Sequence, residues 1–230
     1  MMKWIRRGVL FLICGALVAL ITYSIIHNSK MENSVWDAGT TIGNAETAKV
    51  HYVQYTDLAC PYCDVFTRLA VKNEEAFNAF IEEHNILYEI RMTEMIYDNS
   101  KSTLSRNSNI ASYCALNENK FIEYYHEAVM KLYEDYHSKG IGDTKTSPMI
   151  PELPIDYWLE IGHEVGLGET FDSCVENKET LEKVIANTAR ASQSINGLPS
   201  FQFGKFSTSG FDPSWDYGYV EYYLSAGLPE

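Results

Sequence analysis

Two cysteines three residues apart, where a strand pattern gives way to a helix pattern, constrain this chain more than any other feature. The segment reads Cys60-Pro61-Tyr62-Cys63 and follows the apolar run 50–58. Thiols at this spacing can close a small disulfide ring and open it again. The N-terminus of a helix favours the thiolate over the thiol, because its backbone N–H groups are unpaired and its dipole is positive there. Proline also suits a first helical turn. The arrangement predicts redox chemistry, with Cys60 as the reactive thiol.

A cysteine pair of this kind can also be half of a structural zinc site. Such a site normally needs a second pair at similar spacing, and the remaining cysteines, Cys14, Cys114 and Cys174, are isolated in the sequence. A cysteine hydrolase that uses Cys60 and a remote histidine would leave Cys63 without a purpose. We therefore favour redox chemistry over the zinc, hydrolase and purely structural alternatives. It requires no metal and no organic cofactor.

The first thirty residues predict the cellular compartment in which the rest of the chain lies. Lys3, Arg6 and Arg7 precede an uncharged apolar run over 8–26, which as a helix would extend about 28 Å, close to the thickness of the hydrocarbon core of a bilayer. The positive-inside rule then places residues 1–7 in the cytoplasm. A cleaved secretory signal is the alternative, but the end of the run offers no clear small-residue cleavage site. We predict an uncleaved signal anchor and an extracytoplasmic domain, periplasmic or on the cell surface, which would be secreted if the segment were cleaved.

The composition beyond residue 26 fits a globular domain with a solvated surface. This part of the chain has 15 basic and 31 acidic side chains, a net charge of −16, so nucleic acid is an unfavourable partner. Hydrophobic residues make up 46% of the sequence, and a chain of this length can bury a core without disulfides. The few cysteines are therefore expected to serve chemistry. Residues 27–47 are polar and are interpreted as a linker before a domain over 48–230.

The domain is predicted to begin with a strand, a helix and a second strand. The strand covers 49–58 and is apolar on both faces, as in a sheet covered by helices. Helical spacing of apolar residues continues over 61–83, and the second strand covers 86–92. This order places the cysteines at the carboxyl end of the first strand, where open α/β sheets hold their sites.

A longer helical region and a return to strands complete the domain. Helical patterns separated by turn-rich stretches cover 108–117, 120–137, 156–165 and 178–195. We interpret them as a helical insertion at about 98–190. Strands are then predicted near 199–203, where proline is admissible only at the strand end, and near 206–211, followed by a helix over 214–226.

With these residues in view, the chain resembles the DsbA-like disulfide oxidoreductases of the thioredoxin-like superfamily. The resemblance rests on the run 56–63, on Gly197-Leu198-Pro199-Ser200-Phe201, and on the helical segment between them. It implies an α/β thioredoxin-like fold with a helical insertion subdomain, here preceded by one N-terminal transmembrane helix.

The resemblance assigns roles to particular residues. Cys60 would be the exposed attacking thiol and Cys63 the buried resolving thiol. Pro199 would be a cis-proline whose loop lies against the cysteines and binds the substrate backbone, an isomer that sequence alone does not reveal. Pro61 and Tyr62, between the two cysteines, would border the same substrate site.

The resemblance also bears on the remaining residues near the site and in the insertion. Leu198, also in the substrate loop, stands where the family often has a threonine or valine. Some proteins of this kind have cysteines at positions like Cys114 and Cys174, and a structural disulfide follows if their Cα atoms lie within about 7 Å. The alternative is two buried thiols that never meet.

Two polar residues precede the cysteines. Many thioredoxins carry a buried acid six residues before the first cysteine, where this chain has Gln54, so no proton relay is expected through that position. Asp57 lies three residues before Cys60. We interpret it as a turn or helix-start residue in preference to an acid or base.

Together these features predict a membrane-anchored thiol–disulfide oxidoreductase, held in the membrane by 8–26, that acts on extracytoplasmic protein thiols and disulfides. A redox partner must then reoxidise or reduce the cysteine pair. The alternative is a thioredoxin-fold module that binds peptides or holds unfolded chains without redox turnover. The Pro-Tyr dipeptide does not fix whether the enzyme works as an oxidase, a reductase or an isomerase.

Overall fold

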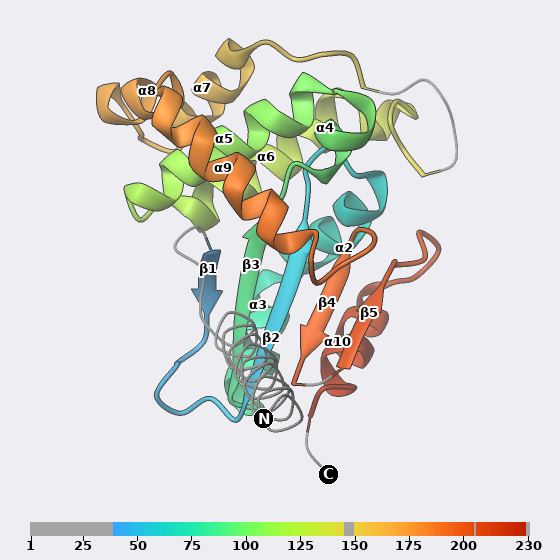
Figure 1. Cartoon of the computed structure of the whole chain (residues 1–230). Coiled ribbons are helices and arrows are strands. Elements are labelled where there is room, and N and C mark those ends of the chain that lie inside the picture. Colours follow the sequence, from blue (N-terminus) through green and yellow to red (C-terminus); the bar gives the residue numbers. More distant parts are fainter. Residues whose placement is uncertain (1–38, 145–149, 205, 229–230) are drawn as a thin grey trace, which may run out of the picture. The chain divides into compact units, whose positions relative to one another are not determined.

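The computed structural model describes residues 39–144, 150–204 and 206–228. These residues build a mixed five-stranded sheet in the order β1-β3-β2-β4-β5 (Figure 1). β2 and β3 are parallel, and every other neighbouring pair is antiparallel. The strands are β1 (Gly39–Ile42), β2 (Val50–Thr56), β3 (Ile86–Met92), β4 (Ser200–Phe203) and β5 (Phe206–Ser209).

Three helices, α2 (Pro61–Lys72), α3 (Glu74–Glu83) and α10 (Tyr217–Ser225), lie against the sheet. Aromatic packing joins α2 and α10 to β4, because the ring centroid of Phe201 lies 4.7 Å from that of Phe66 and 5.4 Å from that of Tyr223. β2 and β3 lie inside the sheet, and β2 is buried along most and β3 along all of its length, as expected of strands covered on both faces.

The helical insertion follows β3 and lies beyond the carboxyl ends of β2 and β3 in Figure 1. Its core contains the fully buried side chains of Tyr124, Trp158 and Phe171. The elements are α4 (Met95–Ser100), α5 (Thr103–Asn117), α6 (Phe121–Asp135), the 3-10 helix η1 (His137–Lys139), α7 (Ile155–Glu164), α8 (Glu169–Val175) and α9 (Lys178–Ala191).

The linker expected over 27–47 is partly wrong. Gly39–Ile42 forms β1, which pairs antiparallel with β3 at the edge of the sheet. An edge strand of four residues has one neighbour and little alternation of apolar and polar residues, so the sequence does not mark it. The sheet therefore begins before residue 48.

The single helix expected over 61–83 is also corrected. It is two helices, α2 and α3, which meet at Asn73. The Asn73 side chain donates a hydrogen bond to the Leu69 carbonyl oxygen at 2.8 Å and so satisfies a carbonyl at the end of α2. Apolar residues keep their helical spacing across this break, which is why the pattern does not show it. The short helices α4 and α8 were likewise not expected.

The anchor expected over 8–26 lies outside the described residues, as does the beginning of the linker. Within 39–144, 150–204 and 206–228, no helix combines the length and the apolar character that crossing a membrane requires.

Candidate active site

The cysteine pair lies where the chain leaves β2 and enters α2. Cys60 has an extended backbone and caps the helix, and Pro61 follows in the first turn. The Cys60 amide donates to the Asp57 carbonyl oxygen at 3.0 Å, and the Asp64 amide donates to the Cys60 carbonyl oxygen at 3.1 Å. Cys60 and Cys63 are both free thiols. The motif therefore stands at the strand-to-helix junction that the sequence predicts.

Both thiols are enclosed by the fold. The exposed fraction is 4% for Cys60 and 1% for Cys63, so the expectation of an exposed Cys60 is wrong. The cause is the loop opposite, because the Cys60 sulfur lies 3.8 Å from the Leu198 carbonyl oxygen. Tyr62 is 42% exposed and is the part of the motif that faces solvent.

The surroundings of Cys63 favour its neutral form. Burial raises the pKa of the Cys63 thiol well above its ordinary value, and a hydrogen bond and charge interaction with Cys60 act in the same direction. A backbone hydrogen bond from Asp57 lowers this pKa, whereas the negative charge of the Asp57 carboxylate raises it. Cys63 thus holds its proton tightly at neutral pH.

The loop before β4 brings a second segment to the cysteines. The Leu198–Pro199 peptide bond is cis, as the family resemblance implies. The Pro199 carbonyl oxygen accepts a hydrogen bond from the Gly210 amide at 2.7 Å, which ties the loop to the chain that follows β5. Cys60 and Leu198 are 138 residues apart in the sequence, and the fold places them in contact.

Asp57 is fully buried beside the motif. Its Oδ1 accepts a hydrogen bond from the Ala59 amide at 2.9 Å, which confirms its predicted role in the turn. Its Oδ2 accepts from the Ile96 amide at 3.0 Å and from the Ser105 hydroxyl at 2.6 Å. Burial, helped by the charge of Glu94, raises the pKa of Asp57 to about 6, although the three hydrogen bonds lower it. The contacts with α4 and α5 have no signal in the sequence.

A partly buried ion pair lies next to this carboxylate. Arg106 of α5 donates to both oxygens of Glu94, from Nε at 2.6 Å and from Nη2 at 2.8 Å. Its guanidinium carbon lies 3.4 Å from the ring centroid of Tyr97, and the Glu94 amide donates to the Thr188 hydroxyl of α9 at 2.9 Å. The residues after β3 are therefore fixed to two helices of the insertion, which sequence reasoning did not foresee.

Gln54 occupies the position of the missing buried acid and is engaged as a neutral amide. The Tyr88 hydroxyl donates to its Oε1 at 2.5 Å, and its Nε2 donates to the Thr67 hydroxyl at 3.3 Å. The Thr67 and Tyr125 hydroxyls lie 2.9 Å apart and share a hydrogen bond. These contacts leave Gln54 a structural role at the centre of the sheet.

A second buried carboxylate follows Cys63 directly. Asp64 accepts a hydrogen bond from Arg68 Nε at 3.2 Å, and the Nε2 atom of His137 lies 3.8 Å from its Oδ1. Burial raises the pKa of Asp64, while the charges of His137, Arg68 and Lys72 lower it. The pair joins the first turn of α2 to η1.

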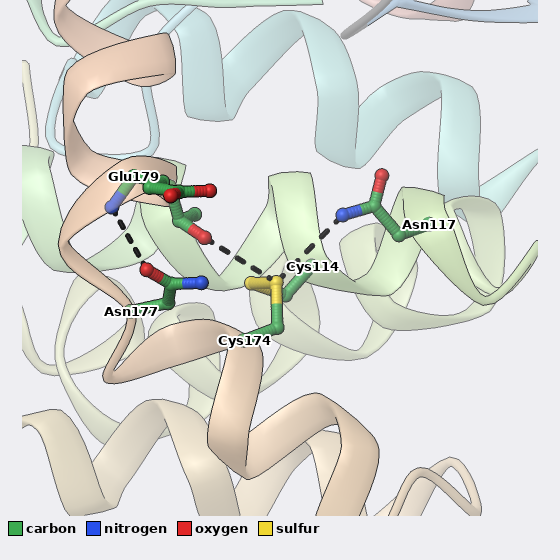
Figure 2. Close-up of a disulfide and its surroundings, with 6 residues drawn as sticks. Cys114, Asn117, Cys174, Asn177 and Glu179 are labelled. Carbon is green, nitrogen blue, oxygen red and sulfur yellow. Dashed lines mark hydrogen bonds between the residues drawn. A yellow bond between two sulfur atoms is a disulfide. The ribbon is translucent and has the colours of Figure 1, made fainter.

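The remaining described cysteines form a disulfide. Cys114 of α5 and Cys174 of α8 are bonded, with their Cα atoms 5.7 Å apart. Figure 2 shows the Asn117 side chain directed at the Cys174 sulfur, with its Nδ2 at 3.7 Å, and the Thr180 hydroxyl lies 3.6 Å from the same sulfur. The bond links two helices of the insertion and involves neither thiol of the motif.

Comparisons with known proteins agree with this geometry. The family model described as thioredoxin matches residues 37–205. No curated protein matches the chain. Among solved structures, a thioredoxin-like oxidoreductase from Silicibacter pomeroyi DSS-3 is 18% identical, with 82% of this chain and 91% of that chain covered and a TM-score of 0.56.

Two further solved structures have the same degree of likeness. The catalytic domain of Proteus mirabilis ScsC is 19% identical, with 85% of this chain and 92% of that chain covered and a TM-score of 0.56. The thiol-disulfide exchange protein alpha-DsbA2 from Wolbachia pipientis is 17% identical, with 81% and 85% covered and a TM-score of 0.56. At these identities the likeness is one of fold.

Proposed function

The chain belongs to the thioredoxin family, and from this premise we propose that it is a thiol–disulfide oxidoreductase that exchanges disulfides with protein substrates. The observation that carries the proposal is the pair of free thiols at the start of α2, with the Leu198 carbonyl oxygen against Cys60. Proteins of the same fold include a thioredoxin-like oxidoreductase and a thiol-disulfide exchange protein, which supports the same chemistry here.

The two cysteines divide the reaction between them. In the oxidising direction, a substrate thiolate attacks the Cys60 sulfur of the Cys60–Cys63 disulfide, forms a mixed disulfide and expels Cys63, which takes up a proton. A second substrate thiolate then attacks the substrate sulfur of the mixed disulfide. The substrate leaves oxidised by two electrons, and both enzyme cysteines are reduced. A redox partner restores the disulfide, and the reverse order of steps reduces a substrate.

The substrate site in this proposal is formed by the loop before β4 and by the residues between the cysteines. Leu198 and Pro199 would meet the substrate backbone beside Cys60, and Pro61 and Tyr62 would border it on the other side. The exposed Tyr62 ring supports this placement, since it faces solvent next to an otherwise buried thiol. Aromatic side chains are well suited to such contacts because they offer a large rigid area.

We also propose that the protein is anchored by residues 8–26 and faces the outside of the cytoplasmic membrane. The basic flank and the apolar run of the sequence support this orientation, and a solved structure of similar fold is a periplasmic thioredoxin-like protein from Salmonella enterica. The full-length protein should fractionate with membranes and be digested by protease added to intact cells or spheroplasts. Release of a soluble form that begins near residue 27 would show instead that the segment is a cleaved signal.

Trapping of substrates tests the chemistry. In cells that make Cys63→Ser, mixed disulfides should accumulate on Cys60 because the resolving thiol is gone, and non-reducing gels should show them as adducts that disappear with reductant. The matched control is the double variant Cys60→Ser/Cys63→Ser, which should form none. If Cys63→Ser also forms none, the oxidoreductase proposal fails and the alternative, a peptide-binding module without redox turnover, takes its place.

A further inference from the structure

We propose that an aromatic stripe at α10 extends the substrate site and favours substrate segments that carry lysine or arginine near the reacting cysteine. The stripe is formed by Trp215, just before the helix, and by Tyr219 and Tyr222 on it. The inference deepens the proposed function and rests on it. It assigns a chemical class to the part of the substrate that flanks the reacting cysteine.

The stripe begins beside the loop that contains Pro199. β4 and β5 are antiparallel, and Ser200 pairs with Ser209, so the chain that leaves β5 lies next to the loop that enters β4. The Gly210 amide donates a hydrogen bond to the Pro199 carbonyl oxygen at 2.7 Å. This turn after β5 lies at the end of the sheet where α2 begins (Figure 1). A substrate held by the loop before β4 would therefore lie close to the segment 210–216.

Ring contacts connect this segment to α2 and to α10. The Phe211 ring centroid lies 5.2 Å from that of Phe66 on α2 and 5.0 Å from that of Trp215, both edge to face. The rings of Trp215 and Tyr219 are stacked, with centroids 4.7 Å apart and planes at 11°. The Tyr222 centroid lies 6.4 Å from that of Tyr219. The stripe is thus a continuous row of rings that packs against the helix of the cysteine motif.

The rings of the stripe are accessible to a partner. Tyr219 is 44% exposed and Tyr222 is 67% exposed, whereas Val220 and Leu224 form the buried side of α10. Exposed aromatic side chains are common in protein-binding surfaces. They also attract ammonium and guanidinium groups through the faces of their rings. The stripe therefore suits a chain segment that carries cationic side chains.

The charges around the stripe favour the same partner. Residues 206–230 contain four acidic side chains and no Lys, Arg or His. Asp212 and Asp216, on either side of the first ring in the sequence, are exposed. Within the described residues, their hydrogen bonds come from Ser214 and Gly218 and reach only Oδ1. A cationic segment on the stripe would meet ring faces and open carboxylate oxygens, whereas an acidic segment would be repelled.

The experiment measures how fast Cys60 forms a disulfide with peptides of different charge, in the full chain with Cys63→Ser in mild detergent. Each peptide has one cysteine, which is bonded to a coloured aryl thiol. The Cys60 thiolate attacks the peptide sulfur, and the aryl thiolate leaves because its pKa is low. One peptide has lysines beside its cysteine, and the matched peptide has glutamines there. The release of colour gives the second-order rate constant.

Adding Asp212→Asn and Asp216→Asn together should slow the reaction of the lysine peptide about fivefold and leave the glutamine peptide unchanged. Asparagine keeps the acceptor oxygen in both turns, so the fold should be retained. The effect should disappear in about 1 M salt, where screening acts beyond about 3 Å.

Tyr219→Ser should slow the lysine peptide about threefold in the same assay, because a contact between the cation and the ring is lost. The matched control is Asp156→Asn at the start of α7, which removes one exposed charge from the insertion. It should leave both rates unchanged. Comparing variants on one peptide removes the effect of the lysines on the peptide's own reactivity.

Each other outcome has a defined meaning. If neither the asparagine pair nor Tyr219→Ser slows the lysine peptide, the inference is overturned. Dimers of the full chain, or binding to vesicles of neutral lipid, that Tyr219→Ser abolishes at unchanged peptide rates would assign the stripe to a second copy or to lipid and also overturn it. If Tyr219→Ser does not fold, the asparagine pair decides. A chain whose Cys60 reacts with neither peptide would refute the proposed function itself.

Discussion

Removal of the Cys114–Cys174 disulfide should cost a large part of the stability of this domain. The bond closes a loop between residues 60 apart in the sequence. In the chain-entropy description, releasing a loop of this length returns about 14 cal/mol/K to the unfolded chain, which is about 4 kcal/mol at 25 °C. Domains of this kind are typically stable by about 5–15 kcal/mol. The double variant Cys114→Ala/Cys174→Ala should therefore fold, but with a much smaller margin.

The measurement is equilibrium unfolding by urea of four proteins without reductant: the wild type, the two single alanine variants and the double variant. Fluorescence reports on the folded domain, because Trp158 is fully buried in the insertion and Trp215 packs against Phe211, and circular dichroism reports on the helices. Each single variant already opens the loop, so all three variants should lose about the same 4 kcal/mol, and the two single losses should not add.

A matched control separates the covalent bond from its surroundings. Asn117→Ala removes the hydrogen bond to the Cys174 sulfur while the disulfide stays, and at this exposed position it should cost less than about 0.5 kcal/mol. A loss below about 1 kcal/mol in the double variant would refute the reasoning, as would single losses that sum to the double. Exchange at the motif should stay intact in the folded variants.

Two further predictions concern stability. Because the pKa of Asp57 is raised from 3.8 to about 6, the folded state binds this proton more tightly. The free energy of unfolding should therefore fall by about 3 kcal/mol as pH rises from about 4 to 6, and Asp57→Asn should lack this slope when unfolding is measured across that range. Gly162→Ala should lose about 1–3 kcal/mol in the same assay, because the new methyl would lie 2.2 Å from a ring carbon of Phe171, whereas Gly168→Ala, with nothing within 4 Å, should lose much less.

The parts of the fold that the sequence predicts are those with a strong local pattern. β2 carries apolar residues on both faces, at Val50, Tyr52, Val53 and Tyr55, because it is central and covered on both sides. The helices α6, α7 and α9 of the insertion bury one face each, so their apolar residues recur at helical spacing. The position of the cysteine motif follows from the point where the strand pattern ends and the helix pattern begins. These elements are determined by residues that are close together in the sequence, so sequence patterns are enough to predict them.

The parts that the sequence does not predict depend on distant segments. β1 forms because the edge of β3 is available for pairing. The residues Gly39–Ile42 themselves carry no pattern that predicts this pairing. Cys60 is buried because a carbonyl oxygen 138 residues away lies against it. The cap at Asn73 interrupts a helix whose apolar spacing continues unchanged. In the first two cases a partner from elsewhere in the chain decides the outcome, whereas the break at Asn73 involves a local contact with Leu69.

The chemistry of the motif combines both kinds of information. Cys60 lies at the N-terminus of α2, and this position follows from local sequence alone. A motif of two thiols three residues apart works only if the second thiol keeps its proton while the first reacts, and local sequence does not provide that difference. Here burial supplies it, together with the hydrogen bond and charge interaction with Cys60, by raising the pKa of Cys63. The turn before the motif is held from the insertion as well, because the Ile96 amide and the Ser105 hydroxyl donate hydrogen bonds to the Asp57 carboxylate.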